Sequence, residues 1–128
     1  MKPVLAVAVG SAVGGVLRFW LTAWVERVLP SQMPLGTLLV NVTGSFAIGV
    51  LAAAFLDRGH VSATTVWPAL LMTGLLGGFT TFSAFSLQTL MLTQQGRWMD
   101  AGANVALSVL LCLCAVWLGW HVGMMHQG

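Results

Sequence analysis

The sequence predicts an all-α membrane protein with four transmembrane helices, and two observations carry this prediction. Hydrophobic residues make up 58% of the 128 residues and charged residues only 6%, with a mean hydropathy of +0.91. A soluble domain has about a quarter of its residues charged, so this chain has too few polar groups to cover a surface in water. The few charges also leave three long charge-free stretches, each of which exceeds the roughly 20 apolar residues that cross a bilayer.

Three of the four expected helices lie in charge-free stretches, and the first contains Arg18. Residues 28–56, 59–96 and 101–128 contain no Asp, Glu, Lys or Arg. We therefore expect a single transmembrane domain over residues 1–128, with spans near 4–26, 34–56, 66–94 and 101–123. Indole rings favour the headgroup region, and four tryptophans lie near the expected span ends: Trp24, Trp67, Trp98 and Trp120.

Composition and motifs exclude several classes of function. Lysine and arginine are spread along the chain, whereas a nucleic-acid-binding domain clusters its basic residues on one face. No Asp or Glu lies deep within a span, which argues against proton coupling through a buried carboxylate. The sequence has no Ser-His-Asp set, metal-ligand cluster or phosphate-binding loop, so we expect no enzyme activity and no nucleic-acid partner. Cys112 and Cys114 lie in an apolar run and are expected to be free, buried thiols.

Lysine and arginine residues outside the spans are equally divided between the two sides of the membrane. Lys2 and Arg58 lie on the side of the N-terminus, whereas Arg27 and Arg97 lie on the other. The positive-inside bias orients a membrane protein through an asymmetry in these residues, and here there is none. One interpretation is a chance tie in a small protein with short loops. The other is dual topology, in which copies insert in both orientations and pair antiparallel.

The first span combines small residues with one buried charge. Gly10 and Gly14 form a small-xxx-small face, a spacing that lets helix backbones approach closely in lipid. Gly119 and Gly123 repeat the spacing in the last span. Arg18 is the one charge well within a span. Intramembrane charges usually have a function, although Arg18 is also near enough to the span end for its long side chain to reach the interface.

The third span has a composition that a helix facing only lipid does not need. Residues 73–89 read TGLLGGFTTFSAFSLQT. Glycine in a helix costs about 1 kcal/mol relative to alanine, and the glycines here are followed by the hydroxyl residues Thr80, Thr81, Ser83 and Ser86. One interpretation is a broken helix that lines water or is buried in protein, where freed carbonyls can hold a cation and amides an anion. The other is a bent helix whose glycines only make room for its neighbours.

Further side chains are candidates for contact with an ion. Phe82 and Phe85 share one helix face, and the ring edge of phenylalanine is electropositive, so the pair suits a weakly held anion as well as simple packing. Asn41, near the middle of the second span, can bond another helix or offer its NH2 group to a permeating ion. The fourth span places Asn104 and Ser108 one turn apart.

Three stretches of the sequence together resemble the Fluc fluoride channels, a family also called CrcB. They are GSAVGGVLRFW, GTLLVNVTGSF and GLLGGFTTFSAFS, at residues 10–20, 36–46 and 74–86. The stretches occur in the same order in three of the four spans, and the third is highly specific. The length and the number of helices also agree with that family.

The resemblance implies an antiparallel, dual-topology homodimer with two fluoride pores and a structural sodium ion (Na+) at its centre. Backbone carbonyls of Gly77 and Thr80 would hold the sodium where the third helix breaks, and no organic cofactor is implied. The positions that match the fluoride pore of the family are Asn41, Phe82, Ser83, Phe85, Ser86 and Ser108. Arg18 matches the arginine of the first helix, and Thr81 is a further candidate in the third motif.

The implied function is passive export of cytoplasmic fluoride by a multi-pass channel in the inner (plasma) membrane, and hence fluoride resistance. Such a pore must replace the hydration of a small anion with donors weak enough to release it. Two positions depart from the family pattern: Ala84 stands where a hydroxyl is common, and Gln88 stands where an acidic residue is common. The chain has no tyrosine, and Asn104 is the candidate to replace the aromatic hydroxyl that some members have in the fourth helix.

A small multidrug transporter is the alternative function, because such transporters are also four-helix, dual-topology dimers of similar length. Such transporters are proton-coupled exchangers and need a carboxylate in the first span. In this chain Glu26 lies at the end of that span, next to Arg27. A structural subunit of a larger membrane complex is a second alternative, and the polar composition of the third span argues against it.

Overall fold

The computed structural model describes residues 1–56 and 65–125, and every regular element in these residues is helical. Two long helices come first, α1 (Lys2–Val28) and α2 (Leu35–Leu56). The last element is α6 (Trp98–Met125). The third span, between them, is built from four pieces: α3 (Val66–Pro68), the π-helix η1 (Ala69–Leu76), α4 (Gly77–Phe79) and α5 (Phe82–Gln94).

The described residues contain four helical spans that are long and apolar enough to cross a membrane, which confirms the predicted all-α architecture. The first and last helices extend two or three residues beyond the expected spans at each end. Of the two interpretations of the third span, the structure has the interruption, which lies between α4 and α5.

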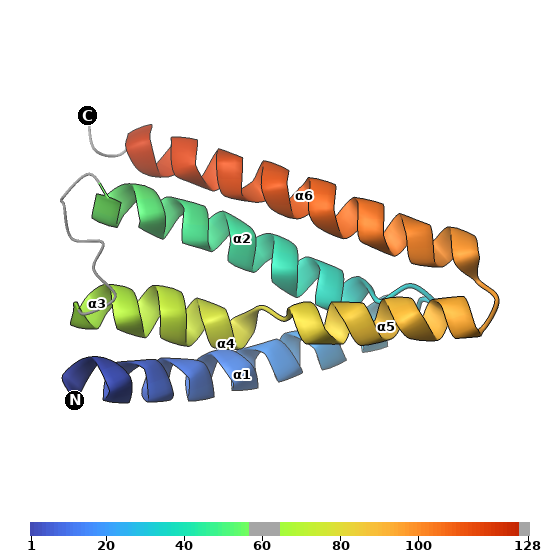
Figure 1. The fold of residues 1–128 in the computed structure, drawn as a ribbon, viewed down its shortest axis with the longest axis horizontal. Helices are drawn as coiled ribbons and strands as arrows, with labels where there is room; N and C mark the ends of the chain where they lie inside the picture. Colours follow the sequence, from blue (N-terminus) through green and yellow to red (C-terminus); the bar gives the residue numbers. More distant parts are fainter. Residues whose placement is uncertain (57–64, 126–128) are drawn as a thin grey trace.

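The helices associate as two pairs that lie side by side (Figure 1). In one pair α2 packs along α6, and in the other α1 packs along η1 and α4. After the interruption, α5 packs against α6. The third span therefore belongs to one helix pair before the interruption and contacts the other pair after it, which places the interruption between the two pairs.

Glycines set the close approach of the helices within each pair. A Cβ atom on Gly14 would lie 2.8 Å from the backbone nitrogen of Phe79, so α1 and the third span touch backbone to backbone. A Cβ atom on Gly119 of α6 would overlap the carbonyl oxygen of Phe46 in α2. Such contact stabilises the fold in lipid, where van der Waals packing holds helices together. The predicted small-residue faces are thus confirmed as helix contacts.

A Schellman motif ends α5 and turns the chain into α6. Gly96 has a φ of +74°, in the left-handed region that glycine adopts without steric cost. Its N–H donates to the carbonyl of Thr93 at 3.0 Å, and the N–H of Arg97 donates to the carbonyl of Leu92 at 2.9 Å. These are the two hydrogen bonds of the motif. Because the turn is so short, α5 and α6 are antiparallel neighbours.

The same turn brings two of the predicted loops to one end of the molecule. Nη1 of Arg97 donates to the carbonyl of Gln32 at 3.2 Å, so the loop after α1 and the loop after α5 lie together. Arg27 lies in the last turn of α1, at this end, and Lys2 begins α1 at the other. These three basic residues therefore lie on the expected sides, and Arg58 falls outside the described residues.

Candidate functional site

Two threonines form the interruption of the third span. Thr80 (φ −82°, ψ 159°) and Thr81 (φ −152°, ψ 116°) have extended backbones between α4 and α5. Thr81 caps α5, because its hydroxyl oxygen accepts the N–H of Ala84 at 3.2 Å, as threonine often does at a helix start. Gly78 instead makes room for a neighbour, since a Cβ atom there would lie 2.6 Å from the carbonyl oxygen of Ser11. The threonines, rather than the glycines, mark the interruption.

Asn41 of α2 pairs with the backbone that the interruption leaves open. Its Nδ2 donates to the carbonyl of Thr81 at 3.0 Å, and its Oδ1 accepts the N–H of Thr81 at 2.7 Å. In a continuous helix that N–H would donate to the carbonyl of Gly77. An amide matches both groups of a peptide unit because it carries a donor and an acceptor. The structure thus has the hydrogen bond between helices that was expected for Asn41, and contact of its second N–H with an ion stays a prediction.

Arg18 of α1 reaches the same interruption from another helix. Its Nη1 donates to the carbonyl of Thr80 at 3.2 Å, in a partly buried contact. The guanidinium group therefore lies at the interruption, which favours a role there over a side chain extended to the membrane interface. The positive end of the α5 dipole points to the same place, so this part of the molecule is electropositive.

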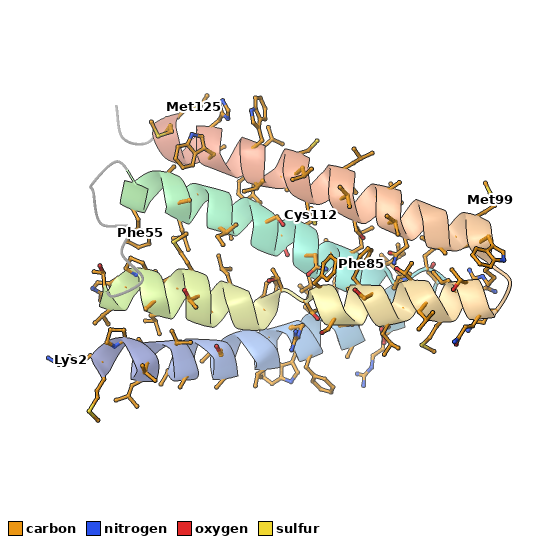
Figure 2. The ribbon with its side chains drawn as sticks, viewed as in Figure 1. Lys2, Phe55, Phe85, Met99, Cys112 and Met125 are labelled. Atoms are coloured by element: carbon orange, nitrogen blue, oxygen red, sulfur yellow. The ribbon has the colours of Figure 1, made fainter. Side chains whose placement is uncertain are left out.

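A cavity of about 470 Å³ opens beside the interruption. It brings together most of the residues predicted from the sequence. From α2 and α6 come Asn41 and Ser108, and from the third span come Gly77, Thr80, Thr81, Phe82 and Phe85. Phe85 lies just after the interruption, and Cys112 of α6, which also lines the cavity, lies on the neighbouring helix pair (Figure 2).

Phe82 and Phe85 form an aromatic pair at the cavity. Their ring centroids are 5.2 Å apart and their planes are tilted by 52°, an arrangement that the ring quadrupoles favour. The two rings differ in exposure, because Phe85 is 9% exposed and Phe82 is 78% exposed. Phe85 is therefore held within the chain, whereas Phe82 presents its ring to lipid or to another chain.

Ser83 and Ser86 do not line this cavity. The hydroxyl of Ser83 lies 3.2 Å from the hydroxyl of Thr81, and the hydroxyl of Ser86 donates to the carbonyl of Phe82 at 2.9 Å. Both serines are exposed. A single chain thus does not gather every hydroxyl of the predicted polar track around one cavity.

Asn104 also lies outside the cavity, in contact with α5. It is 2% exposed, and its Nδ2 donates to the hydroxyl of Thr89 at 2.9 Å. Ser108, one turn further along α6, is 8% exposed and lines the cavity. The replacement of an aromatic hydroxyl by Asn104 stays a prediction, whereas its hydrogen bond joins α5 to α6.

The two positions that depart from the family pattern differ in their surroundings. Ala84 contributes its backbone N–H to the cap of α5, so a missing hydroxyl side chain leaves that cap in place. Gln88 has a buried Oε1 that finds no hydrogen-bond partner among the described residues. Burying an acceptor without a partner costs roughly 1–3 kcal/mol, so we expect Gln88 to tolerate an apolar side chain of similar length.

Two residues at the site were not singled out from the sequence. Gly44 lets α2 approach the interruption, because a Cβ atom there would overlap the side chain of Thr80. Thr89 donates its hydroxyl to the carbonyl of Phe85 at 2.8 Å. The spacing in the sequence could have indicated both residues. Gly44 follows Asn41 by three residues and Thr89 follows Phe85 by four, so each shares a helix face with a predicted site residue.

Backbone oxygens are the available ligands for a cation at this site. Within residues 1–56 and 65–125, no cluster of His, Cys, Asp or Glu could hold a metal ion. The carbonyl of Gly77 lacks its usual helical donor, since the N–H of Thr81 is bonded to Asn41. The carbonyl of Thr80 has two lone pairs, of which Arg18 uses one. Such oxygens fit a hard cation, although one chain offers only part of a coordination shell.

Comparison with known proteins gives a consistent result. The family model described as CrcB-like protein, Camphor Resistance (CrcB), matches residues 5–120. A protein of Paramagnetospirillum magneticum named fluoride-specific ion channel FluC is 52% identical over 116 residues, which are 91% of this chain and 90% of that protein.

Two further relatives carry the same name. The protein from Rhodospirillum rubrum is 47% identical over 119 residues, covering 93% of this chain and 92% of its own length. The protein from Methylocella silvestris is 49% identical over 118 residues, covering 92% and 89%. The similarity therefore extends over all four spans and includes the interruption.

Proposed function

This chain belongs to the CrcB family, and from that premise we propose that it conducts fluoride along the cavity beside the interruption at Thr80 and Thr81. The family is one of ion channels, so the chain is not an enzyme. The interruption is the observation that carries the proposal. Irregular backbone at membrane depth is tolerated where it is buried in protein or lines an aqueous path, and here aromatic and amide groups surround a cavity next to it.

The groups around the cavity are suited to an anion that must be bound and released. Fluoride gives up strongly held water when it leaves solution, and a pore must offer donors in return. The amide of Asn41 and the hydroxyl of Ser108 are such donors, and the ring edges of Phe82 and Phe85 add weaker positive charge. Donors of moderate strength permit exit as well as entry. Arg18 at the interruption adds an attractive potential for anions.

A second copy of the chain completes the proposed pathway. Phe82 is 78% exposed, and the exposed serines Ser83 and Ser86 lie outside the cavity of one chain. We expect these groups to meet the partner in a homodimer with two pores. The even division of basic residues between the two ends favours an antiparallel, dual-topology pair.

A structural sodium ion at the centre of that dimer is the proposed cofactor. Two copies would offer the carbonyls of Gly77 and Thr80 twice, and the bound ion would supply a fixed positive charge beside the anion path. An ion that binds only the folded chain stabilises it by about 2.7 kcal/mol at a concentration one hundred times its Kd. Replacing sodium with N-methyl-D-glucamine should therefore lower the unfolding midpoint. A midpoint that is independent of sodium would remove the ion from the proposal.

The biological role that follows is passive export of cytoplasmic fluoride through the inner (plasma) membrane, and thus fluoride resistance. A channel of this kind has no coupled step, so the concentration gradient alone drives the anion. The multidrug-transporter alternative is not favoured, because Glu26 lies at the end of α1 and does not line the cavity.

Fluoride efflux from proteoliposomes, measured with a fluoride electrode, tests the function. Phe82→Ile removes the ring at the cavity, and Phe19→Ile is a matched control, because Phe19 is 70% exposed on α1 and does not line the cavity. We expect fast efflux in the wild type and in Phe19→Ile, and a loss of roughly tenfold or more in Phe82→Ile, the scale of one lost interaction of about 1.4 kcal/mol.

Three results would change the proposal in different ways. Equal efflux in Phe82→Ile and Phe19→Ile would keep the channel and reject the phenylalanine path. Chloride efflux as fast as fluoride efflux would reject fluoride selectivity. No fluoride efflux from folded wild-type protein would reject the function.

A further inference from the structure

A chain of two hydrogen bonds joins α6 to the backbone of Phe85. Nδ2 of Asn104 donates to the hydroxyl oxygen of Thr89 at 2.9 Å. The hydroxyl of Thr89 in turn donates to the carbonyl of Phe85 at 2.8 Å. Because the Asn104 amide is the donor to Thr89, the hydroxyl hydrogen of Thr89 remains free to point at Phe85. Successive hydrogen bonds of this kind polarise and strengthen each other.

Asn104, the first donor of these two hydrogen bonds, is rigidly placed. Asn104 is 2% exposed and lies in the second turn of α6, one turn before Ser108, which lines the cavity. Asn104 does not line the cavity itself. The packing of Asn104 therefore fixes the position of Thr89 relative to α6. The hydrogen bond from Thr89 in turn fixes the backbone of Phe85, whose ring lines the cavity.

Phe82 has no comparable anchor within the described residues, although it carries a similar local bond. The hydroxyl of Ser86 donates to the carbonyl of Phe82 at 2.9 Å, as Thr89 does for Phe85. Ser86 is exposed, and the hydrogen bond to a second helix occurs at Thr89. The exposures of the two rings follow the same division, with Phe85 at 9% and Phe82 at 78%.

We propose that Asn104 and Thr89 are positioning residues for Phe85, and that they hold its ring at the separation from Phe82 that fluoride passage requires. The inference rests on the proposed function, because it assigns these residues a role in the same pathway. Neither residue touches the permeating ion. Their effect passes through the carbonyl of Phe85, at the first turn of α5, where a hydroxyl bond to the backbone also influences the bend of the helix.

Matched variants of two threonines on α5 test the inference. Thr89→Val removes the hydroxyl without changing the volume, and Thr89→Ser keeps the hydroxyl. Thr93→Val is the control, because the hydroxyl of Thr93 donates at 2.7 Å to the carbonyl of Leu90 in its own helix and Thr93 does not line the cavity. Asn104→Leu removes the donor on α6 and leaves the local bond of Thr89 intact.

For each variant, fluoride efflux is measured in proteoliposomes and the unfolding midpoint is measured in mixed micelles. We expect Thr89→Val and Asn104→Leu to reduce efflux by roughly five- to tenfold, the factor that one net hydrogen bond represents. Thr89→Ser should restore wild-type efflux, and Thr93→Val should not change it. Because the two residues act in series, Asn104→Leu should have little further effect on efflux in the Thr89→Val background.

The possible failures are distinct. Wild-type efflux in both Thr89→Val and Asn104→Leu overturns the inference alone, and so does a reduction in Thr93→Val equal to that in Thr89→Val. Full additivity of Asn104→Leu and Thr89→Val also overturns it, since a purely structural loss at two sites gives that result. If Asn104→Leu does not fold, the comparison of Thr89→Val with Thr89→Ser decides. Absence of fluoride efflux in the wild type overturns the proposed function first, and the inference with it.

Discussion

Replacing Gly14 with alanine tests whether backbone contact between α1 and the third span holds the interruption in position. The new methyl group would overlap the carbonyl oxygen of Leu75 in η1 and would lie 2.8 Å from the backbone nitrogen of Phe79 in α4. Ordinary van der Waals contact begins near 3.4 Å. These neighbours are backbone atoms and cannot rotate away, so α1 must move away from η1 and α4 by more than the roughly 0.6 Å that is lacking at the Phe79 nitrogen.

Gly15→Ala is the matched control on the same helix. A Cβ atom on Gly15 has no neighbour within 4 Å, yet alanine gains the same helix propensity there, about 1 kcal/mol over glycine. The difference between the two variants therefore isolates the cost of overpacking, which is typically about 1–3 kcal/mol. We expect Gly14→Ala to be less stable than Gly15→Ala by an amount in this range.

Unfolding in mixed micelles with a rising fraction of sodium dodecyl sulfate measures this difference. Tryptophan fluorescence follows the transition, since the chain has six tryptophans. Both variants are compared at one protein concentration, because assembly of copies would make the midpoint depend on concentration. Equal midpoints for the two variants, or a lower midpoint for Gly15→Ala, would refute the reasoning about close backbone packing.

Three further substitutions have expected outcomes in the same unfolding assay. Asn41→Leu should destabilise the fold by about 1–3 kcal/mol, because both the N–H and the carbonyl of Thr81 lose their partner; wild-type stability would mean that water replaces the amide. Gln88→Met should leave stability unchanged or raise it, since the buried Oε1 has no partner among the described residues, and a clear loss would instead reveal a donor on a second copy. Arg97→Ala should cost less than about 1 kcal/mol, because its ion pair with Asp100 is partly exposed, with side chains 24% and 41% accessible; a larger cost would show that the loop contact of Arg97 stabilises the fold.

The positions of the spans could be predicted from the sequence because partition into a bilayer is a property of each segment alone. A stretch such as residues 28–56 is apolar and long enough whatever its neighbours are, and three of the four spans appear where the long charge-free stretches lie. The tight contacts of Gly14 and Gly119 could be anticipated for a similar reason, since small residues at that spacing leave a flat helix surface.

The candidate site was predicted in part. Asn41, Phe85 and Ser108 come from three different spans and meet at one cavity. Ser83 and Ser86 do not reach that cavity in the single chain. A motif on one helix covers more than one face, and the packing of the other helices decides which face is the inner one.

The exact position of the interruption depended on contacts that the local sequence does not contain. Glycine was the expected cause, because it weakens a helix, yet the backbone leaves helical geometry at Thr80 and Thr81. The freed peptide groups are stabilised there by Arg18 from α1 and Asn41 from α2. A break at a glycine would have lacked these partners, and an unpaired peptide group in lipid is costly.

The sequence by itself therefore determined the membrane class, the number of spans and the residue types of the site, because hydrophobic length and motif are properties of contiguous residues. Only the tertiary structure decided which backbone groups Asn41 and Arg18 bond. It also decided that Phe85 is buried while Phe82 is exposed, and that Asn104 is linked to Phe85 through Thr89. The physical reason is that a hydrogen bond between helices requires a separation of about 3 Å, and such separations depend on how closely the helices pack.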